Sequence, residues 1–311
     1  MLEIKRSIPV LLLYPFMLLR NTIALRKIVK AEQVEIVQVN DFYNMLGVML
    51  KAFGYKGRLL TYVRFLPSVM PGILRNLWIK FGLKYSDKMI AVSDAVLKQL
   101  PANPKAIRIY DPVQLTERQS QKTYGTKDTI LVLYLSNYIK GKGQDDAVEA
   151  FATAYNMNKN LRLTFMGGDM GLEKNIAFRA SLEARVNELG LSDVVTFAPF
   201  NPDVESAIKS VDIVLNFSEA ESFSMTCLEA AYYGTALIAT RCGGPEEIID
   251  NGNTGITVPV KDTVAMSDAL LQLANNAALR NQYAIAGRQY VITKFSIDGY
   301  KKTMQQAITG N

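Results

Sequence analysis

Short apolar runs rich in β-branched residues alternate along this chain with longer segments of helical periodicity. Strands are predicted at residues 34–40, 58–65, 88–92, 107–110, 129–135, 161–166, 194–198, 213–217, 236–239 and 255–258. One helix is predicted after the first strand and ends near residue 53, and another begins near residue 93. Further helices are predicted at residues 73–83, 145–155, 176–189, 204–210, 225–233, 264–276, 279–294 and 296–309. This alternation is typical of parallel sheets built from β-α-β units, so the expected fold class is α/β.

The alternation forms two series, and a polar segment separates them. Residues 116–128 are rich in Gln, Lys and Thr and have no apolar periodicity, which predicts a linker between two domains. After the linker, residues 129–295 hold enough strands for a complete, doubly wound Rossmann-like domain, and 296–311 form a last helix. Before it, residues 1–115 hold only about four strands, so we expect a shortened Rossmann-like domain there.

The 311 residues include no histidine. A Ser-His-Asp or Cys-His nucleophile pair, a histidine-containing zinc site and an imidazole base are therefore excluded. The two cysteines, Cys227 and Cys242, fit neither a disulfide framework nor a zinc-ligand spacing, and we interpret them as small buried hydrophobic residues. So few cysteines favour a reducing, cytoplasmic location. Any chemistry must use carboxylates, lysine or arginine, and backbone amides.

Positive charge is concentrated in the first series. Through residue 115 there are 17 Lys and Arg against 7 Asp and Glu, whereas the remainder has 18 against 22. No zinc-finger, helix-turn-helix or aromatic ribonucleoprotein signature accompanies the basic residues, so nucleic acid is not the expected partner. The apolar run 8–19, which basic residues up to Lys30 follow, has no signal-peptide cleavage site and is too short to span a membrane. We expect this run to be buried or to make a peripheral contact with an anionic inner-membrane face; a basic surface without a partner is the alternative.

Three strand ends in the second series lead into polar or glycine-rich loops, which is where open α/β sheets bind ligands. The loop after residue 135 ends in Lys142-Gly143 before a helix, and this lysine either pairs with a phosphate or belongs to a solvated turn. The loop after residue 166 begins with Gly167 and a second glycine, for which a tight turn is an equal explanation.

The third strand end, after residue 217, has the strongest pattern. Glu221 precedes a helix, and Glu229 lies eight residues further on, inside it. Carboxylates in these places can accept hydrogen bonds from sugar hydroxyls, and the amides of 222–225 point toward an anion at the helix start. The alternative is an acidic pair that only complements the helix dipole.

The wider stretch resembles the donor-binding half of the retaining GT-B glycosyltransferases of family 4. The pattern in that family is Glu-x7-Glu, a glycine, a strand and Gly-Gly-x-x-Glu, with a phosphate-binding Lys-Gly earlier in the chain. The residues that carry the resemblance here are Glu221, Glu229, Gly234, Gly243, Gly244 and Glu247, together with Lys142 and Gly143. The resemblance covers essentially all of 129–311.

This resemblance implies a GT-B fold, with two Rossmann-like domains, the first one incomplete, and a C-terminal helix that returns toward the first. It implies that Glu221 holds the hydroxyls of the donor sugar, Glu229 those of the ribose, and that Lys142 neutralises the diphosphate. Glu221 and Lys142 are thus the expected catalytic residues, the donor is expected to be UDP- or GDP-linked, and neither a metal nor a separate cofactor is expected. The other donor-binding residues implied are Ser136, Asn137, Gly143, Gly167, Ser222, Phe223, Ser224 and Met225.

Two departures from the family pattern bear on activity. Ser136-Asn137 stands where the family commonly has Gly-Arg, whose arginine pairs with phosphate, so Lys142 would carry most of that charge. The family's Glu-Gly-Phe-Gly is replaced at 221–224 by Glu-Ser-Phe-Ser, which gives the backbone less freedom to approach a ligand.

The first series matches the family more loosely. The acceptor-side residues implied there are Asn40, Asp41, Ser93 and Arg64, the last at a place where relatives often carry a histidine. The Gly-rich strand, loop and helix that normally open the fold are not found before residue 34, so we expect either a truncated start or a shortened family member.

Together these patterns predict a retaining glycosyltransferase of surface-polysaccharide or lipopolysaccharide assembly. It would transfer a sugar from a nucleotide-sugar donor to a lipid-linked or saccharide acceptor. Two alternatives stay open. One is a catalytically impaired, donor-binding partner of another transferase; the other is a sugar-nucleotide epimerase of the same fold, against which the absence of histidine counts.

Overall fold

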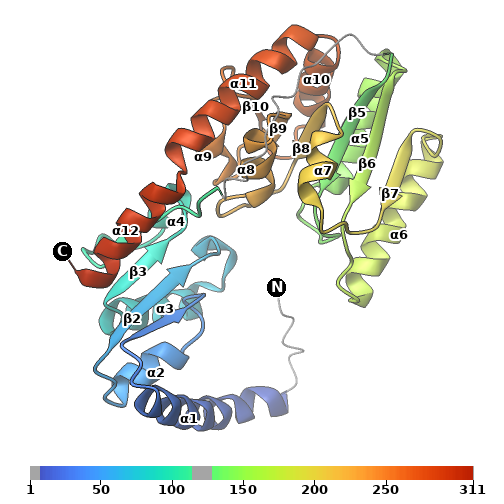
Figure 1. Ribbon diagram of the computed structural model, residues 1–311. Helices are drawn as coiled ribbons and strands as arrows, with labels where there is room; N and C mark the ends of the chain where they lie inside the picture. Colours follow the sequence, from blue (N-terminus) through green and yellow to red (C-terminus); the bar gives the residue numbers. More distant parts are fainter. Residues whose placement is uncertain (1–7, 114–127, 311) are drawn as a thin grey trace. The chain divides into compact units, whose positions relative to one another are not determined.

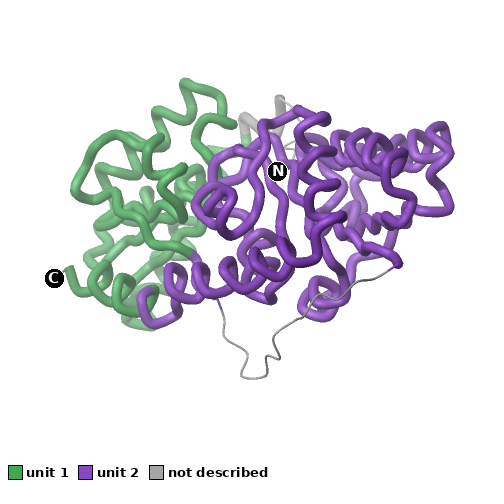
Figure 2. The backbone as a smooth tube through the Cα atoms, turned by 90° about the horizontal axis from the view of Figure 1, so that it is seen from above, with its two compact units in different colours: residues 1–110, 300–311 green, residues 111–299 purple. Residues whose placement is uncertain are grey.

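The computed structural model describes residues 8–113 and 128–310. The chain divides into two compact units, residues 1–110 with 300–311 and residues 111–299 (Figure 2). Each unit contains one parallel sheet with helices packed against it (Figure 1), so the expected α/β class with two Rossmann-like parts is confirmed. The predicted linker, 116–128, lies outside the described residues except for Asp128.

The sheet of the first unit has four parallel strands in the order β1-β2-β3-β4. These strands are β1 (Ile36–Val39), β2 (Arg58–Val63), β3 (Lys88–Ala91) and β4 (Ala106–Arg108). The helices are α1 (Ile8–Ala31), α2 (Leu46–Ala52), the 3-10 turn η1 (Pro67–Val69), α3 (Gly72–Tyr85), α4 (Asp94–Leu97) and, from Tyr300 onward, α12 (Ile297–Thr309).

Helices cover both faces of this sheet. Gly47 of α2 is close to Leu59 of β2, because a β-carbon at Gly47 would lie 2.6 Å from the Leu59 side chain. The hydroxyl of Tyr62, also in β2, contacts Tyr300 and Met304 of α12. Since residues 59 and 62 of one strand point to opposite faces, α2 and α12 lie on opposite sides of the sheet. The expected C-terminal helix is therefore present, and it packs on the first unit's sheet.

Helix α1 buries only one narrow stripe of its surface. It packs against α2, and Thr22 and Val29, seven residues apart, are the buried positions of its described part. Phe16 is 65% exposed, and most other apolar side chains of the helix from residue 13 onward are exposed as well. Burial of the apolar run, one of the two expectations from the sequence, is thus wrong for its described side chains. Over residues 8–113 and 128–310, none of the helices combines the length and apolarity that crossing a bilayer demands.

The sheet of the second unit has six parallel strands in the order β10-β9-β8-β5-β6-β7. These strands are β5 (Ile130–Leu135), β6 (Leu161–Met166), β7 (Val195–Ala198), β8 (Ile213–Asn216), β9 (Ala236–Thr240) and β10 (Ile256–Val258). The helices are α5 (Gln144–Met157), α6 (Glu173–Glu188), α7 (Val204–Lys209), α8 (Met225–Tyr232), α9 (Pro245–Ile248), α10 (Thr263–Ala274) and α11 (Ala277–Lys294).

The strand order of this second sheet fixes where a ligand can bind. The chain proceeds outward from β5 through β6 to β7, and then returns to β8 on the other side of β5. Parallel sheets of this kind bind ligands beyond the carboxyl ends of the strands at such a reversal. A ligand is therefore expected beyond the carboxyl ends of β5, β6 and β8.

Candidate functional site

The three strand ends bring the predicted donor-side residues of the second unit together. Ser136 follows β5 and donates its backbone N–H to the carbonyl of Met166 at the end of β6, at 3.0 Å. Gly167 follows β6 at the same level, where a β-carbon would lie 1.9 Å from the Ser136 carbonyl oxygen. The side-chain oxygen of Asn137 accepts the N–H of Gly168 at 3.2 Å. Glycine at 167 therefore allows the two strand ends to touch.

Lys142 and Glu221 form an ion pair at the centre of these loops. The ammonium of Lys142 lies 2.8 Å from Oε1 of Glu221, and both side chains are partly shielded from solvent. The hydroxyl of Ser218 donates to the same oxygen at 2.8 Å. Within the described residues Oε2 of Glu221 has no hydrogen-bond partner. The carboxylate is thus held by two groups through one oxygen, while the other oxygen can accept a hydroxyl hydrogen.

Tyr134 joins the two loops that carry this ion pair. Its side chain is fully buried, and its hydroxyl donates to the carbonyl of Lys142 and accepts the backbone N–H of Phe217 at 2.7 Å. Burial raises the pKa of Tyr134 well above its usual value, so the hydroxyl keeps its proton. Gly143 has φ +76°, and a β-carbon there would lie 2.0 Å from the Phe217 carbonyl oxygen. The loop after β5 and the loop after β8 are therefore in direct contact.

Helix α8 begins four residues after Glu221, and backbone N–H groups at its start have no hydrogen-bond acceptor within the described residues. Ser224 is the N-cap, and its hydroxyl accepts the N–H of Cys227 at 3.4 Å and the side-chain amide of Asn216 at 3.1 Å. Within the described residues, the backbone N–H groups of Ser222, Ser224 and Met225 donate to no acceptor. Exposed amides at a helix N-terminus bind anions.

Ser224 adopts a backbone conformation that glycine adopts more readily. Its φ of +78° lies in the left-handed region, which costs a residue with a β-carbon about 1–2 kcal/mol. This is the place where the resemblance leads one to expect glycine. The serine compensates through the two hydrogen bonds of its hydroxyl.

Phe223 contributes only its backbone to the site. The side chain is buried and lies edge-on to Phe295, with the ring centroids 5.3 Å apart. Gly244, in the loop after β9, sits so close that a β-carbon would lie 2.2 Å from the Phe223 Cα atom. The glycine pair of the family pattern thus allows the β9 loop to support the loop that carries Glu221.

Glu229 lies further along α8, beside a cavity of about 350 Å³. The other residues that line the cavity are Pro112, Val113, Met225, Leu228, Tyr232 and Tyr233. Partial burial raises the pKa of the Glu229 carboxyl. Among the described residues its carboxylate has no hydrogen-bond or ion-pair partner. Glu229 is not in contact with the Lys142–Glu221 pair, although Met225, which starts α8, lines the same cavity.

The predicted acceptor-side residues lie in the first unit, at the carboxyl ends of β1, β2 and β3. Asp41 is buried and accepts the backbone N–H groups of Phe42 and Arg64, at 3.3 and 3.2 Å. Burial raises the pKa of Asp41 to about 6. Asn40 is exposed, whereas Ser93 is fully buried and its hydroxyl caps α4 by accepting the N–H of Val96. The structure thus gives Ser93 a local structural role.

Sequence patterns do not reveal Tyr134 and Ser218. Tyr134 lies in an apolar strand, and its sequence context indicates only a core aromatic residue, because a strand pattern does not show which groups the hydroxyl will contact. Of the two cysteines, Cys227 is buried as expected, whereas Cys242 is partly exposed, and burial raises its thiol pKa to about 11. In the described parts of the chain, no three Asp, Glu or Cys side chains gather into a possible metal site.

Comparison with known proteins gives the following similarities. Residues 116–290 match the family model "Glycosyl transferases group 1". The chain is 30% identical over 236 residues to N-acetyl-alpha-D-glucosaminyl L-malate synthase of Bacillus anthracis, which covers 71% of this chain and 59% of that protein. It is 25% identical over 169 residues to the lipopolysaccharide core biosynthesis glycosyltransferase LpsE of Rhizobium meliloti, covering 54% of this chain and 46% of LpsE. The chain thus spans about half the length of these curated relatives.

Solved structures resemble the fold over nearly the whole chain. Anabaena Alr3699/HepE in complex with UDP and glucose superposes with a TM-score of 0.82 at 14% identity, covering 93% of this chain and 81% of that one. The apo form of the lipopolysaccharide outer core galactosyltransferase WaaB gives 0.75 at 18% identity, with coverages of 96% and 81%. At these identities the likeness concerns the fold.

Proposed function

Because this chain belongs to the group 1 glycosyl transferases, we propose that it transfers a sugar from a nucleotide sugar to a lipid-linked or saccharide acceptor, in surface-polysaccharide or lipopolysaccharide assembly. The observation that carries the proposal is the contact of Lys142 with Glu221 beside the open N-terminus of α8. A cation and free amides suit a diphosphate, and a carboxylate with one free oxygen suits a sugar hydroxyl. The HepE structure, which is similar in fold, holds UDP and glucose.

The proposed roles follow from the charges around the site. Lys142 and the amides of Ser222, Ser224 and Met225 would stabilise the negative charge that develops on the leaving diphosphate. Since Asn137 carries no charge, Lys142 would supply most of the positive charge. Glu221 would hold the donor sugar, and Ser218 would keep its carboxylate in place. Glu229 would accept hydrogen bonds from ribose hydroxyls.

We propose transfer with retention of the anomeric configuration. The bond from the sugar C1 to the diphosphate oxygen breaks, and the acceptor oxygen bonds to C1 on the same face. The acceptor proton passes to the departing phosphate oxygen. Such a step requires no histidine and no other protein base, which is in keeping with a chain that contains no histidine. That a metal is not needed stays a prediction.

We also propose that the first unit contacts an anionic membrane surface through α1. From residue 13 onward this helix exposes apolar side chains such as Phe16, Ile23 and Ile28. Arg20, Arg26, Lys27 and Lys30 lie on the same helix, which contains no acidic residue. An exposed helix of apolar and basic residues is suited to the interface of a bilayer that carries negative charge. A lipid-linked acceptor would be reached at that surface.

Nucleotide binding tests the donor site directly. Titration calorimetry with UDP and GDP should show binding of one of them, and Glu229→Gln should weaken it about tenfold to a hundredfold, because a hydrogen bond to a charged acceptor is lost. Glu173→Gln is the control, since Glu173 is an exposed acid on α6.

The affinity for the nucleotide should also depend on pH. A protonated Glu229 accepts hydrogen bonds poorly, so the affinity of the wild type should fall as the pH is lowered toward the raised pKa of Glu229, and Glu229→Gln should lose this pH dependence. A folded Glu229→Gln protein that binds as tightly as wild type would contradict the assignment.

A second candidate function is donor binding without turnover, as the partner of another transferase. Asn137 favours it, because the arginine that commonly pairs with phosphate in the family is absent here. The two candidates share the nucleotide site and differ only in whether a sugar is released.

A further inference from the structure

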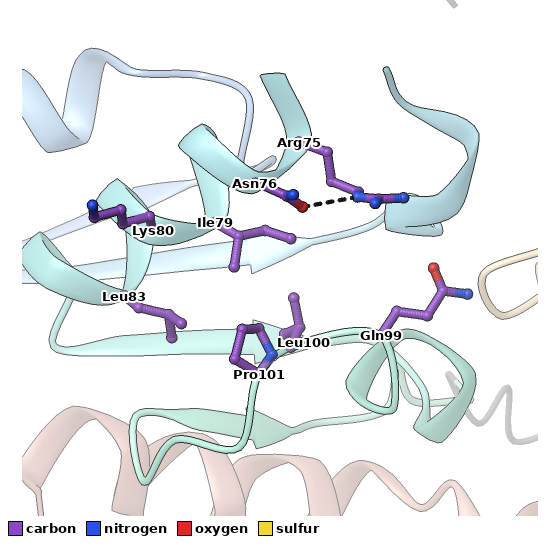
Figure 3. Close-up of a pocket in the computed structure, with 8 residues that line it drawn as sticks. All are labelled: Arg75, Asn76, Ile79, Lys80, Leu83, Gln99, Leu100 and Pro101. Carbon is purple, nitrogen blue, oxygen red and sulfur yellow. Dashed lines mark hydrogen bonds between the residues drawn. The ribbon is translucent and has the colours of Figure 1, made fainter. Parts of the chain in front are cut away.

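A cavity of about 480 Å³ lies in the first unit between α3 and the segment that follows α4. Its two cations, Arg75 and Lys80, lie toward opposite ends of it (Figure 3), so its lining does not gather positive charge at one point. In the second unit, by contrast, contacts from both sides of the donor site converge on one residue. This residue is Phe295, which follows the last residue of α11.

The backbone of Glu221 is held by the segment that follows β9. The N–H of Glu221 donates to the carbonyl of Cys242 at 3.3 Å, and the carbonyl of Glu221 accepts the N–H of Gly244 at 2.9 Å. The next part of the loop is less restrained, since the backbone N–H groups of Ser222 and Ser224 donate to no acceptor within the described residues.

The side chain of Phe223 restrains this part of the loop instead. Its buried ring lies edge-on to the buried ring of Phe295, with the centroids 5.3 Å apart. Edge-to-face pairs at such a separation are favourable beyond the apolar area that they bury. The Phe295 ring therefore holds the loop two residues beyond Glu221.

The end of α11, where Phe295 lies, is attached to the same region of the unit. The ammonium of Lys294 donates to the carbonyl of Glu247 in α9 at 2.8 Å, and the hydroxyl of Tyr290 donates to that carbonyl at 3.4 Å. Helix α9 begins directly after Gly244, and Figure 1 shows it beside α11. These bonds keep Phe295 in place relative to the segment that holds Glu221.

The backbone of Phe295 reaches the other carboxylate of the donor site. Its carbonyl accepts the N–H of Val113 at 3.0 Å, and Val113 lines the cavity beside Glu229. Val113 and Phe295 each lie near one of the two places where the chain passes from one unit to the other. Phe295 thus contacts the Glu221 loop through its ring and the wall of the Glu229 cavity through its carbonyl.

We propose that Phe295 is a positioning residue of the donor site. Its ring sets the place of the Glu221 loop, and its carbonyl holds the wall of the cavity beside Glu229, without contact with the substrate. The proposal rests on the role proposed above for Glu221, and it gives the buried ring between α11 and α12 a part in the reaction.

A double-mutant cycle on the two rings tests this role. Phe295→Leu and Phe223→Leu should each lower the turnover number at least about tenfold, because the Glu221 carboxylate is misplaced. The dissociation constant of the nucleotide should change less than about threefold, since the Phe295 carbonyl and its bond to Val113 are kept. The double variant should be no slower than the slower single variant. Phe151→Leu is the control, because Phe151 is buried in the same unit and stacks on Tyr155 of α5.

Alkylation of the thiol of Cys242 tests the same contact without a ligand or turnover. Cys242 is partly exposed and its carbonyl is bonded to Glu221, whereas Cys227 is buried. At about pH 9, iodoacetamide should modify Cys242 at least about fivefold faster in Phe295→Leu than in wild type, because the loop that covers this segment opens more often. Phe151→Leu should react as wild type.

Three results would overturn the proposal. They are an unchanged alkylation rate in Phe295→Leu, additive losses of turnover in the double variant, and equal effects of Phe295→Leu and Phe151→Leu, since a general loss of stability would then explain both. A wild type that binds neither UDP nor GDP would contradict the donor site, and the alkylation rates would still decide whether Phe295 positions the loop.

Discussion

At the scale of single residues, Tyr134 determines how the two proposed catalytic side chains meet. Its hydroxyl is bonded on both sides by loop backbone, to the carbonyl of Lys142 and the N–H of Phe217. Each loop carries one member of the Lys142–Glu221 pair. Tyr134 is therefore a positioning residue, which acts on the site without touching the substrate.

Tyr134→Phe tests this role. The change leaves a buried carbonyl and a buried N–H without their partner, so the free energy of unfolding should fall by about 1–3 kcal/mol. The turnover number should fall at least about tenfold, with a smaller change in the dissociation constant of UDP, because the Glu221 carboxylate and the Lys142 ammonium are no longer held in the same relative position. Tyr283→Phe is the matched control, since Tyr283 is buried in the same unit and its hydroxyl has no described partner. A loss of stability with unchanged turnover would reduce Tyr134 to a core residue.

The sequence predicts the residues whose spacing belongs to a pattern, and it does not predict those that support them. Glu221, Glu229 and Lys142 follow from their positions relative to strand ends and glycines. That Lys142 and Glu221 touch does not follow, because their contact depends on strand order, which places β8 beside β5. Ser218 is missed for the same reason, since its role is set by the carboxylate that it contacts.

At the scale of elements, the exposed apolar surface of α1 is the feature that packing within the first unit does not explain. The helix is long, its one buried stripe packs on α2, and its remaining apolar side chains from residue 13 onward face outward among basic residues. Patches of exposed apolar side chains on this scale mark interaction surfaces. A bilayer with negative charge satisfies both the apolar and the basic residues.

Phe16→Ser with Ile23→Ser should weaken binding to anionic vesicles. Co-sedimentation with phosphatidylglycerol-containing vesicles should show at least about tenfold weaker partition than wild type, because each large side chain contributes about 1.5–3 kcal/mol when buried in the interface. Raising the ionic strength should weaken wild-type binding, since exposed charges are screened. Ile285→Ser, at an exposed position of α11, is the control. Equal partition of wild type and the α1 variant would contradict the membrane role of this helix.

Helices and strands are predicted correctly where the sequence has a regular apolar pattern. They are predicted poorly where a contact with another part of the structure determines the conformation or the burial. Strand β6 matches the prediction to the residue, because buried apolar residues alternate along it with half-buried ones, which is the period of two that is typical of a strand. The short helix α9 is not predicted, since Gly-Gly-Pro is typical of a turn, although proline is also favoured at the first position of a helix. For α1, apolar content indicates a contact surface but does not tell whether protein or membrane covers it.

At the scale of the whole chain, the two units differ in charge and in what they contain. The basic excess belongs to the first series of elements, whereas the second is slightly acidic and carries the complete six-stranded sheet with the proposed donor site. The first unit provides a four-stranded sheet, the exposed α1 and the cavity beside α3. This division predicts that nucleotide binding depends on the second unit, and lipid contact on the first.

The central claim is that the Lys142–Glu221 site transfers a sugar. The purified chain, incubated with UDP- and GDP-linked sugars and a bacterial membrane lipid extract, should release nucleoside diphosphate from one donor, and mass spectrometry should detect the glycosylated product. Lys142→Met should lower that rate at least about a hundredfold, because the charge that stabilises the leaving group is removed. Tight nucleotide binding with no release from any donor would contradict the claim and support a donor-binding partner, and a Lys142→Met protein as fast as wild type would contradict the assignment of the site.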